Sequence, residues 1–330
     1  MATLEQHFES LKRPSPLGLK PQHDFIAFRK RPLLRLSQES AICLNPGFLQ
    51  EKLESGLFWS MFNSLNSDAD RASLFSTWGR LFEEYVSYLF ARSLDGQGER
   101  YAAFPTFVDK QEEAFDGIIA SDQTWLVMEY KGGFLRADAK YAENEDLFIK
   151  DVRLKFGRDH GAGVEQLARK IGQVFNANKL QRRSLANLDP SGVTTVVPVM
   201  VVQESFISSP ITSTYLCGEF RCAMRTQPVS KHVACTALQI LDVAEVESLR
   251  PYLASGQCSV AQCVMGRARL GDRAPSFHDY FREYIRANNL KRVVEPDFEN
   301  RATAILNRIS LRFFGHPSGA ASKTAPGSQQ

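Results

Sequence analysis

Two acidic residues and a lysine form the pattern in this sequence that best supports chemistry. Asp116 comes early in the apolar run AFDGIIAS (114–121), and Glu129 and Lys131 come near the end of TWLVMEYK (124–131). Side chains alternate between the two faces of a strand, so Glu129 and Lys131 would share a face. Two carboxylates suit Mg²⁺, which prefers oxygen ligands. Lys131 could orient an attacking water or take its proton, so the pattern predicts metal-assisted hydrolysis of a phosphate ester.

The spacing between the two carboxylates fits a β-hairpin. Twelve residues separate Asp116 from Glu129, and Ser121-Asp122-Gln123 has the composition of a turn between two strands. In such a hairpin Asp116 would lie beside Glu129 on the neighbouring strand. The sequence therefore predicts that both carboxylates and Lys131 converge at one end of two adjacent strands.

Further motifs surround this hairpin in a recognisable order. Gly79-Arg80-Leu81-Phe82-Glu83 lies in a helical segment before it, and Gln166 lies in a helical segment after it. With Asp116 and the Glu129-Tyr130-Lys131 tripeptide, residues 75–204 resemble the PD-(D/E)xK superfamily of restriction-endonuclease-like nucleases. Phe115 replaces the proline that often precedes the aspartate, and the roughly 30 residues between Lys131 and the second helix exceed a minimal core.

The resemblance implies an α/β fold with an αβββαβ core and a role for each matching residue. Asp116 and Glu129 would bind Mg²⁺ or Mn²⁺, with the Tyr130 carbonyl as a third oxygen and Glu83 assisting through water. Gln166 would fix the site or touch the nucleic-acid backbone. The implied activity is phosphodiester hydrolysis by a DNA endonuclease, in bacterial restriction, anti-phage defence or repair.

Other interpretations of these residues stay open at this point. Glu129 and Lys131 could form an ion pair on a sheet surface, or the fold could be a catalytically inactive module that binds nucleic acid or protein within a larger complex. Glu84 competes with Glu83 for the position facing the metal. A second tripeptide, Asp138-Ala139-Lys140, has the same residue types but lies in a stretch too polar for a core strand, so we expect only Lys140 to approach the substrate.

The elements that would position these residues follow from hydrophobic periodicity. Apolar residues at helical spacing predict helices over 75–94 and 162–180, and alternating or apolar runs predict strands over 101–108, 114–121, 124–131 and 193–203. The sequence also predicts an extended segment over 24–36 and helices over 46–65, 145–156, 275–288 and 297–314. We expect a mixed central sheet with the first two helices packed against it.

These elements suggest a division of the chain. We expect a flexible N-terminus (1–22), an N-terminal extension (23–70), the nuclease core (71–205), a mostly helical accessory region (206–315) and a disordered tail (316–330).

Composition limits the class of protein. The 330 residues are 43% hydrophobic and 23% charged with a net charge of +3, as expected for a soluble globular protein whose nucleic-acid surface would be local. No apolar run is long enough for a membrane span, and the N-terminus lacks a signal-peptide pattern, so we expect a cytoplasmic protein. The six cysteines contain no CxxC pair, which predicts no stoichiometric zinc. No phosphate-binding loop is present, so any ATPase would act in trans.

A local excess of positive charge lies near the C-terminus. Residues 264–315 contain ten basic and six acidic residues, an excess of four in a chain whose total is +3. Three explanations remain: contact with DNA phosphates, an interface with a protein partner or a second copy, and a solvated surface. For the first, the residues that we expect to contact nucleic acid are Arg282, Arg286, Lys291 and Arg292.

Overall fold

The structure is a computed structural model of the chain. It describes residues 2–15, 18–19, 24–38, 40–94, 98–109, 112–141, 144–271, 274–293, 300, 303–305 and 307–308. The chain forms two compact units. The first consists of Met1–Pro14, Asp24–Gly56 and Val293–Gln330, and the second of Ser15–His23 and Leu57–Arg292.

The first unit combines short helices with a two-stranded antiparallel sheet. Its elements are α1 (Leu4–Lys12), α2 (Ile26–Lys30), β1 (Leu33–Arg35), β2 (Ala41–Cys43) and α3 (Pro46–Glu54). Asn45 caps α3 by accepting the N–H groups of Gly47 and Phe48. The prediction of one extended segment over 24–36 is wrong for Ile26–Lys30, which is helical. Asp24 accepts the Ile26 N–H there and helps to turn the chain into this helix.

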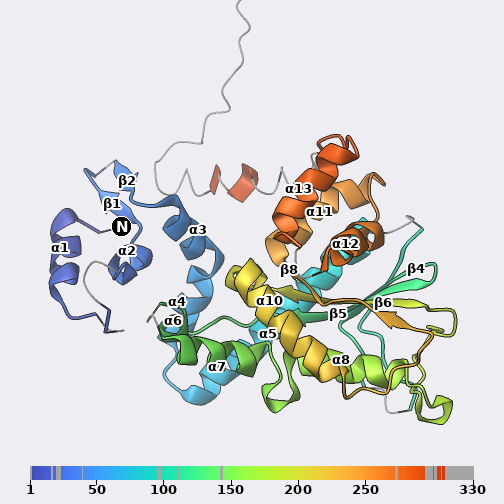
Figure 1. Ribbon diagram of the computed structural model, residues 1–330. Coiled ribbons are helices and arrows are strands. Elements are labelled where there is room, and N and C mark those ends of the chain that lie inside the picture. Colours follow the sequence, from blue (N-terminus) through green and yellow to red (C-terminus); the bar gives the residue numbers. More distant parts are fainter. Residues whose placement is uncertain are drawn as a thin grey trace, which may run out of the picture. The chain divides into compact units, whose positions relative to one another are not determined.

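The second unit is built on a mixed sheet (Figure 1). An antiparallel meander of β3 (Arg100–Ala103), β4 (Gly117–Ser121) and β5 (Thr124–Lys131) forms one half. The run predicted over 193–203 becomes β6 (Thr195–Val202), which is parallel to β5. Two further strands, β7 (Ala234–Cys235) and β8 (Gln239–Asp242), pair in parallel with β6. The prediction of an α/β fold with a mixed sheet is confirmed.

Helices cover both faces of this sheet. One face carries α7 (Glu145–Lys155), α8 (Gly163–Val174) and α10 (Pro210–Met224), while the other carries α5 (Asp68–Ser93), α11 (Val243–Ala254), α12 (Val260–Ala268) and α13 (Phe277–Ala287) (Figure 1). Three further α-helices are α4 (Gly56–Ser64), α6 (Ala137–Tyr141) and α9 (Ser205–Ser208), and two short 3-10 helices span Asp159–Gly161 and Lys179–Gln181. Within the described residues, no helix combines the length and apolar character that a bilayer crossing requires.

Strand β5 lies between the two layers and takes part in both cores. Trp125 and Val127 pack with the α8 layer, whereas Leu126, Met128 and Tyr130 pack with the α5 layer. This is the alternation expected from the sequence, and it assigns Glu129 and Lys131 to the face covered by α8.

Several boundaries differ from the predictions. The helix expected over 46–65 is interrupted at Ser55, and the one expected over 162–180 ends at Val174. The sheet also continues past residue 205, because β8 joins β6. The helix expected over 297–314 lies largely outside the described residues, as does the tail over 316–330.

Candidate active site

The β4–β5 hairpin brings the two predicted carboxylates together. Gly117 pairs with Met128; Asp116 directly precedes Gly117, and Glu129 directly follows Met128. The backbone N–H of Asp116 donates to the Met128 carbonyl at 3.0 Å, and the Asp116 carboxylate accepts the backbone N–H of Tyr130. Asp116 is thus fixed beside β5 at the point where β4 begins.

Glu129 and Lys131 form a direct ion pair on the same strand face. Lys131 Nζ lies 2.6 Å from Glu129 Oε1. The Glu129 side chain is 1% exposed and the Lys131 side chain 22%, so the lysine is the more accessible end of the pair. Buried carboxylates require compensation by a cation or by hydrogen bonds, and Lys131 supplies both to one oxygen of Glu129.

The predicted role of the Tyr130 carbonyl is compatible with the backbone. The N–H and C=O of one strand residue point to the same side, and the Tyr130 N–H points at Asp116. Its carbonyl therefore faces the Asp116 side of β5, while the Lys131 carbonyl faces β6 and accepts from Gln203. The Tyr130 side chain is fully buried, and its hydroxyl lies 3.1 Å from that of Tyr101.

Helix α5 comes close to the end of β5 at Gly132. A Cβ at Gly132 would lie 2.8 Å from Phe82 Cβ and 3.3 Å from Gly79 Cα, so the helix crosses close to the backbone that follows Lys131. This contact places Glu83 within electrostatic range of Asp116, Glu129 and Lys131, whereas Glu84 is exposed. Of the two competing glutamates, Glu83 faces the carboxylates.

Helix α8 contributes a residue that we did not predict. Lys170 Nζ lies 3.8 Å from Glu129 Oε2, and the Lys170 side chain is 6% exposed. The predicted residue on this helix, Gln166, lies one turn earlier and is half-buried, and its side chain makes no hydrogen bond within the described part of the chain. The structure therefore brings together Asp116, Glu129, Lys131 and Glu83, and adds Lys170.

The electrostatics of the site are dominated by buried negative charge. Burial, followed by a hydrogen bond with the Glu113 side chain, raises the pKa of Asp116 to about 7. Burial and the nearby Asp116 raise the pKa of Glu83 to about 7, and the same two causes raise the pKa of Glu129. For Lys131, burial alone would lower the pKa, but Glu129, Asp116 and Glu83 together raise it. The carboxylates thus favour an added cation.

One buried atom supports a metal at this position. Glu129 Oε2 is buried and has no hydrogen-bond partner among the described residues. Those residues contain no group of three His, Cys, Asp or Glu side chains arranged to hold an ion unaided. A Mg²⁺ or Mn²⁺ ion would therefore depend on Asp116 and Glu129, with water and substrate oxygens completing its coordination.

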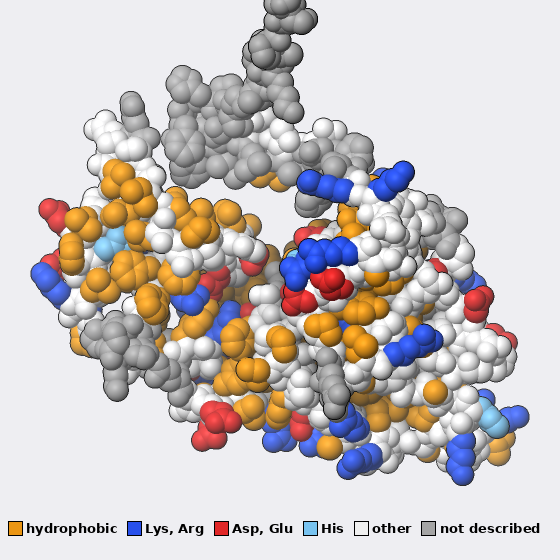
Figure 2. Space-filling model, turned by 45° about the horizontal axis from the view of Figure 1, so that its top comes forward, with side chains coloured by type: hydrophobic (Ala, Val, Ile, Leu, Met, Phe, Trp, Pro, Cys, Tyr) orange, Lys and Arg blue, Asp and Glu red, His pale blue; other side chains and the backbone are white. Residues whose placement is uncertain are grey.

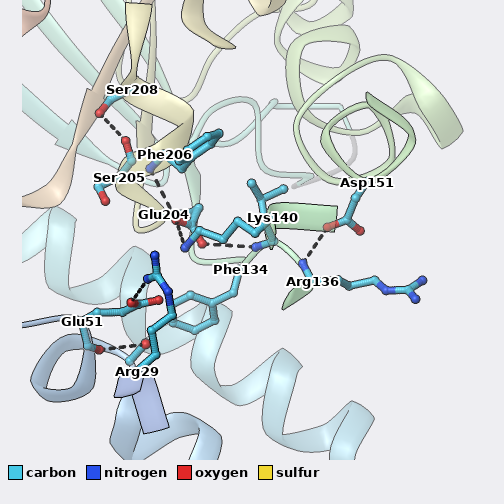
Figure 3. Close-up of polar contacts among 12 residues, drawn as sticks. Arg29, Glu51, Phe134, Arg136, Lys140, Asp151, Glu204, Ser205, Phe206 and Ser208 are labelled. Atoms are coloured by element: carbon cyan, nitrogen blue, oxygen red, sulfur yellow. Dashed lines mark hydrogen bonds and ion pairs between the residues drawn. The ribbon is translucent and has the colours of Figure 1, made fainter. Parts of the chain in front are cut away.

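Lys140 lies in a separate polar cluster after β5. Its Nζ is 2.8 Å from Glu204 Oε1, and Glu204 also accepts from the backbone N–H groups of Leu135 and Phe206 (Figure 3). The Lys140 side chain is 16% exposed. Its charge is largely compensated by Glu204, which lies two residues after the end of β6.

The predicted basic residues of the C-terminal region divide into two pairs. Arg282 pairs with Asp279 and Arg286 with Glu283, both on α13 itself. Lys291 and Arg292 follow α13 and are exposed. On the face shown in Figure 2, basic side chains are dispersed among acidic, polar and apolar groups.

Sequence signals for the residues that we missed were present but weak. Lys170 interrupts the buried stripe of α8 between Leu167 and Ile171, where an apolar residue would be usual. Glu113 precedes Asp116 by three residues, and its hydrogen bond depends on the bend before β4. Neither contact follows from spacing alone.

Comparisons with known proteins give no independent guide. No protein-family model matches the chain, and no match to a curated protein or to a solved structure was found. The functional argument therefore depends on the geometry of this site.

Proposed function

We propose that this protein is a metal-dependent nuclease that hydrolyses phosphodiester bonds, with DNA as the expected substrate. The observation that carries the proposal is the convergence of two buried carboxylates, Asp116 and Glu129, with Lys131 at adjacent strand ends. Glu129 retains a buried oxygen without a hydrogen bond. Three carboxylates, those of Asp116, Glu129 and Glu83, gather here around two lysines, and their raised pKa values are typical of functional sites.

Each residue has a role that its position supports. Asp116 and Glu129 would hold Mg²⁺ or Mn²⁺, and Glu83 would act on the ion through water. The bound metal would polarise the phosphate and favour ionisation of water. Lys131 is the most exposed member of the buried strand cluster, and the neighbouring carboxylates keep it protonated. This favours orientation of the attacking water by its N–H groups over removal of a proton.

The test is a cleavage assay with purified protein on duplex DNA, single-stranded DNA and RNA. We expect cleavage with Mg²⁺ or Mn²⁺ and none with EDTA. Asp116→Ala, Glu129→Ala, Glu129→Gln and Lys131→Ala should each lose about 100-fold or more in rate. Glu84→Ala, which removes an exposed carboxylate next to Glu83, should cleave like wild type. Wild-type rates in the Asp116 or Glu129 variants would refute the assignment.

The second candidate function is a catalytically inactive module that binds nucleic acid or a protein. The direct 2.6 Å ion pair between Lys131 and Glu129 favours it, because such a pair could simply stabilise the sheet. In that case the wild-type protein would leave all three substrates intact with either metal, and Lys131→Ala would change stability alone.

A further inference from the structure

Lys170 is a buried lysine that faces Glu129 without hydrogen-bonding to it. Its Nζ lies 3.8 Å from Glu129 Oε2, which is within ion-pair range but too long for a hydrogen bond. No hydrogen bond to this ammonium group is present among the described residues. The facing oxygen of Glu129 also lacks one. An ammonium group carries three donors, and those of Lys170 are available to another group.

The need to neutralise Glu129 does not by itself explain this lysine. Lys131 already binds the other oxygen of Glu129 at 2.6 Å. Lys170 comes instead from α8, a helix whose buried face is otherwise apolar around it, with Leu167 and Ile171 on either side. It interacts electrostatically with Asp116, Glu83 and Glu129, so its charge is directed at the same cluster.

We propose that Lys170 binds an anionic phosphate oxygen of the nucleic-acid substrate on the α8 side of Glu129. This inference rests on the proposed function and assigns the two lysines different tasks. Lys131 orients the water, and Lys170 supplies the fixed positive charge that the phosphate meets. A lysine with unused donors beside the reacting group is preorganised for that charge, because little has to move when the phosphate arrives.

A structural role makes different predictions. If Lys170 only balanced Glu129, its removal would lower the free energy of unfolding and leave phosphate contacts unchanged. If Lys170 binds phosphate, its removal lowers the cleavage rate and the number of phosphate contacts. Binding of nucleic acid depends on salt with a slope of about 0.7 to 0.9 per neutralised phosphate, so one lost contact is measurable.

The experiment compares Lys170→Met with Arg169→Met. Both remove one positive charge from adjacent positions of α8, but Arg169 is exposed. Single-turnover cleavage would be measured at saturating Mg²⁺, and binding of a labelled oligonucleotide would be measured with Ca²⁺ over a range of salt concentrations. Lys170→Arg serves as a conservative variant, and urea unfolding reports the stability of each protein.

We expect Lys170→Met to lose at least about 30-fold in cleavage rate and to flatten the salt dependence by nearly one unit. Arg169→Met should match wild type in rate, and Lys170→Arg should retain the wild-type salt dependence. If wild type cleaves and Lys170→Met equals Arg169→Met in rate and slope, this inference is wrong and the proposed function stands. If wild type binds with a Lys170-dependent slope but never cleaves, the nuclease proposal fails and the phosphate contact survives.

Discussion

At the scale of single residues, the site is defined by two carboxylates that are almost completely buried. Asp116 is 4% exposed and Glu129 1%. Strand alternation and hairpin spacing predicted that these two side chains would face each other, because both rules depend only on local geometry. Lys170 and Glu113 could not be predicted this way, because their contacts depend on how α8 and the bend before β4 pack.

At this scale we predict how Asp116→Asn changes the pH dependence of stability in metal-free protein. The folded-state pKa of Asp116 is raised to about 7, above its ordinary value, so the folded state binds this proton more tightly than the unfolded state. The resulting stability is greatest in acid and is lost as the pH rises through 7. When the pH is raised from 5.5 to 8 in EDTA, the free energy of unfolding of wild type should fall by about 2 kcal/mol more than that of the variant.

Urea unfolding at the two pH values measures this difference. Asn keeps an oxygen that can accept the Tyr130 N–H, so the comparison isolates the charge. Asp122→Asn is the matched control, because Asp122 is exposed in the turn between β4 and β5. Its pH dependence should equal that of wild type. An Asp116→Asn variant with unchanged pH dependence would show that Asp116 is ionised in the folded state without penalty.

At the scale of elements, the contact between α5 and the end of β5 determines where Glu83 lies. The helix and the strand were both predictable from periodicity. Their close approach depends on the absence of a side chain at Gly132. The sequence motif identified Gly79, but the distance at Gly132 appears only in the folded structure.

Two adjacent glycines provide a test of this contact. A Cβ at Gly132 would lie 2.8 Å from Phe82 Cβ, so Gly132→Ala should cost about 1 to 3 kcal/mol and displace α5 together with Glu83. A Cβ at Gly133 would meet no atom within 4 Å, so Gly133→Ala should change stability by less than about 0.5 kcal/mol. Urea unfolding compares the two, and equal stabilities would show that α5 does not depend on the close approach.

The segment after β5 is held by the ion pair between Lys140 and Glu204. Removing one partner of a buried ion pair leaves the other charge uncompensated. Lys140→Met should therefore lower the free energy of unfolding by about 3 kcal/mol. The double variant Lys140→Met/Glu204→Gln should recover part of that loss, which thermal unfolding would show. Our sequence prediction gave Lys140 a contact with nucleic acid. A flatter salt dependence of binding in stable Lys140→Met protein would support that role over an anchoring one.

At the scale of the whole molecule, the sequence predicted the central strands of the sheet but not where the sheet ends. The apolar runs of β5 and β6 are long and unambiguous, whereas β8 has only four residues and lies in a stretch of weak signals. Its pairing with β6 is a long-range contact that periodicity cannot reveal. The elements between residues 205 and 292 belong to the same compact unit as the hairpin with Asp116 and Glu129.

The basic residues near the end of this unit test whether its surface contributes to binding. Arg282 and Arg286 are paired with acids on α13, whereas Lys291 and Arg292 are exposed and form no ion pair among the described residues. If this region contacts phosphates, Lys291→Ala/Arg292→Ala should flatten the salt dependence by about one to two units, and Arg282→Ala/Arg286→Ala by less, because their charges are already engaged. Each double variant removes two positive charges, so a nonspecific loss of net charge would affect both equally. An unchanged slope with a shift in the mass measured by light scattering would identify this region as an assembly surface instead.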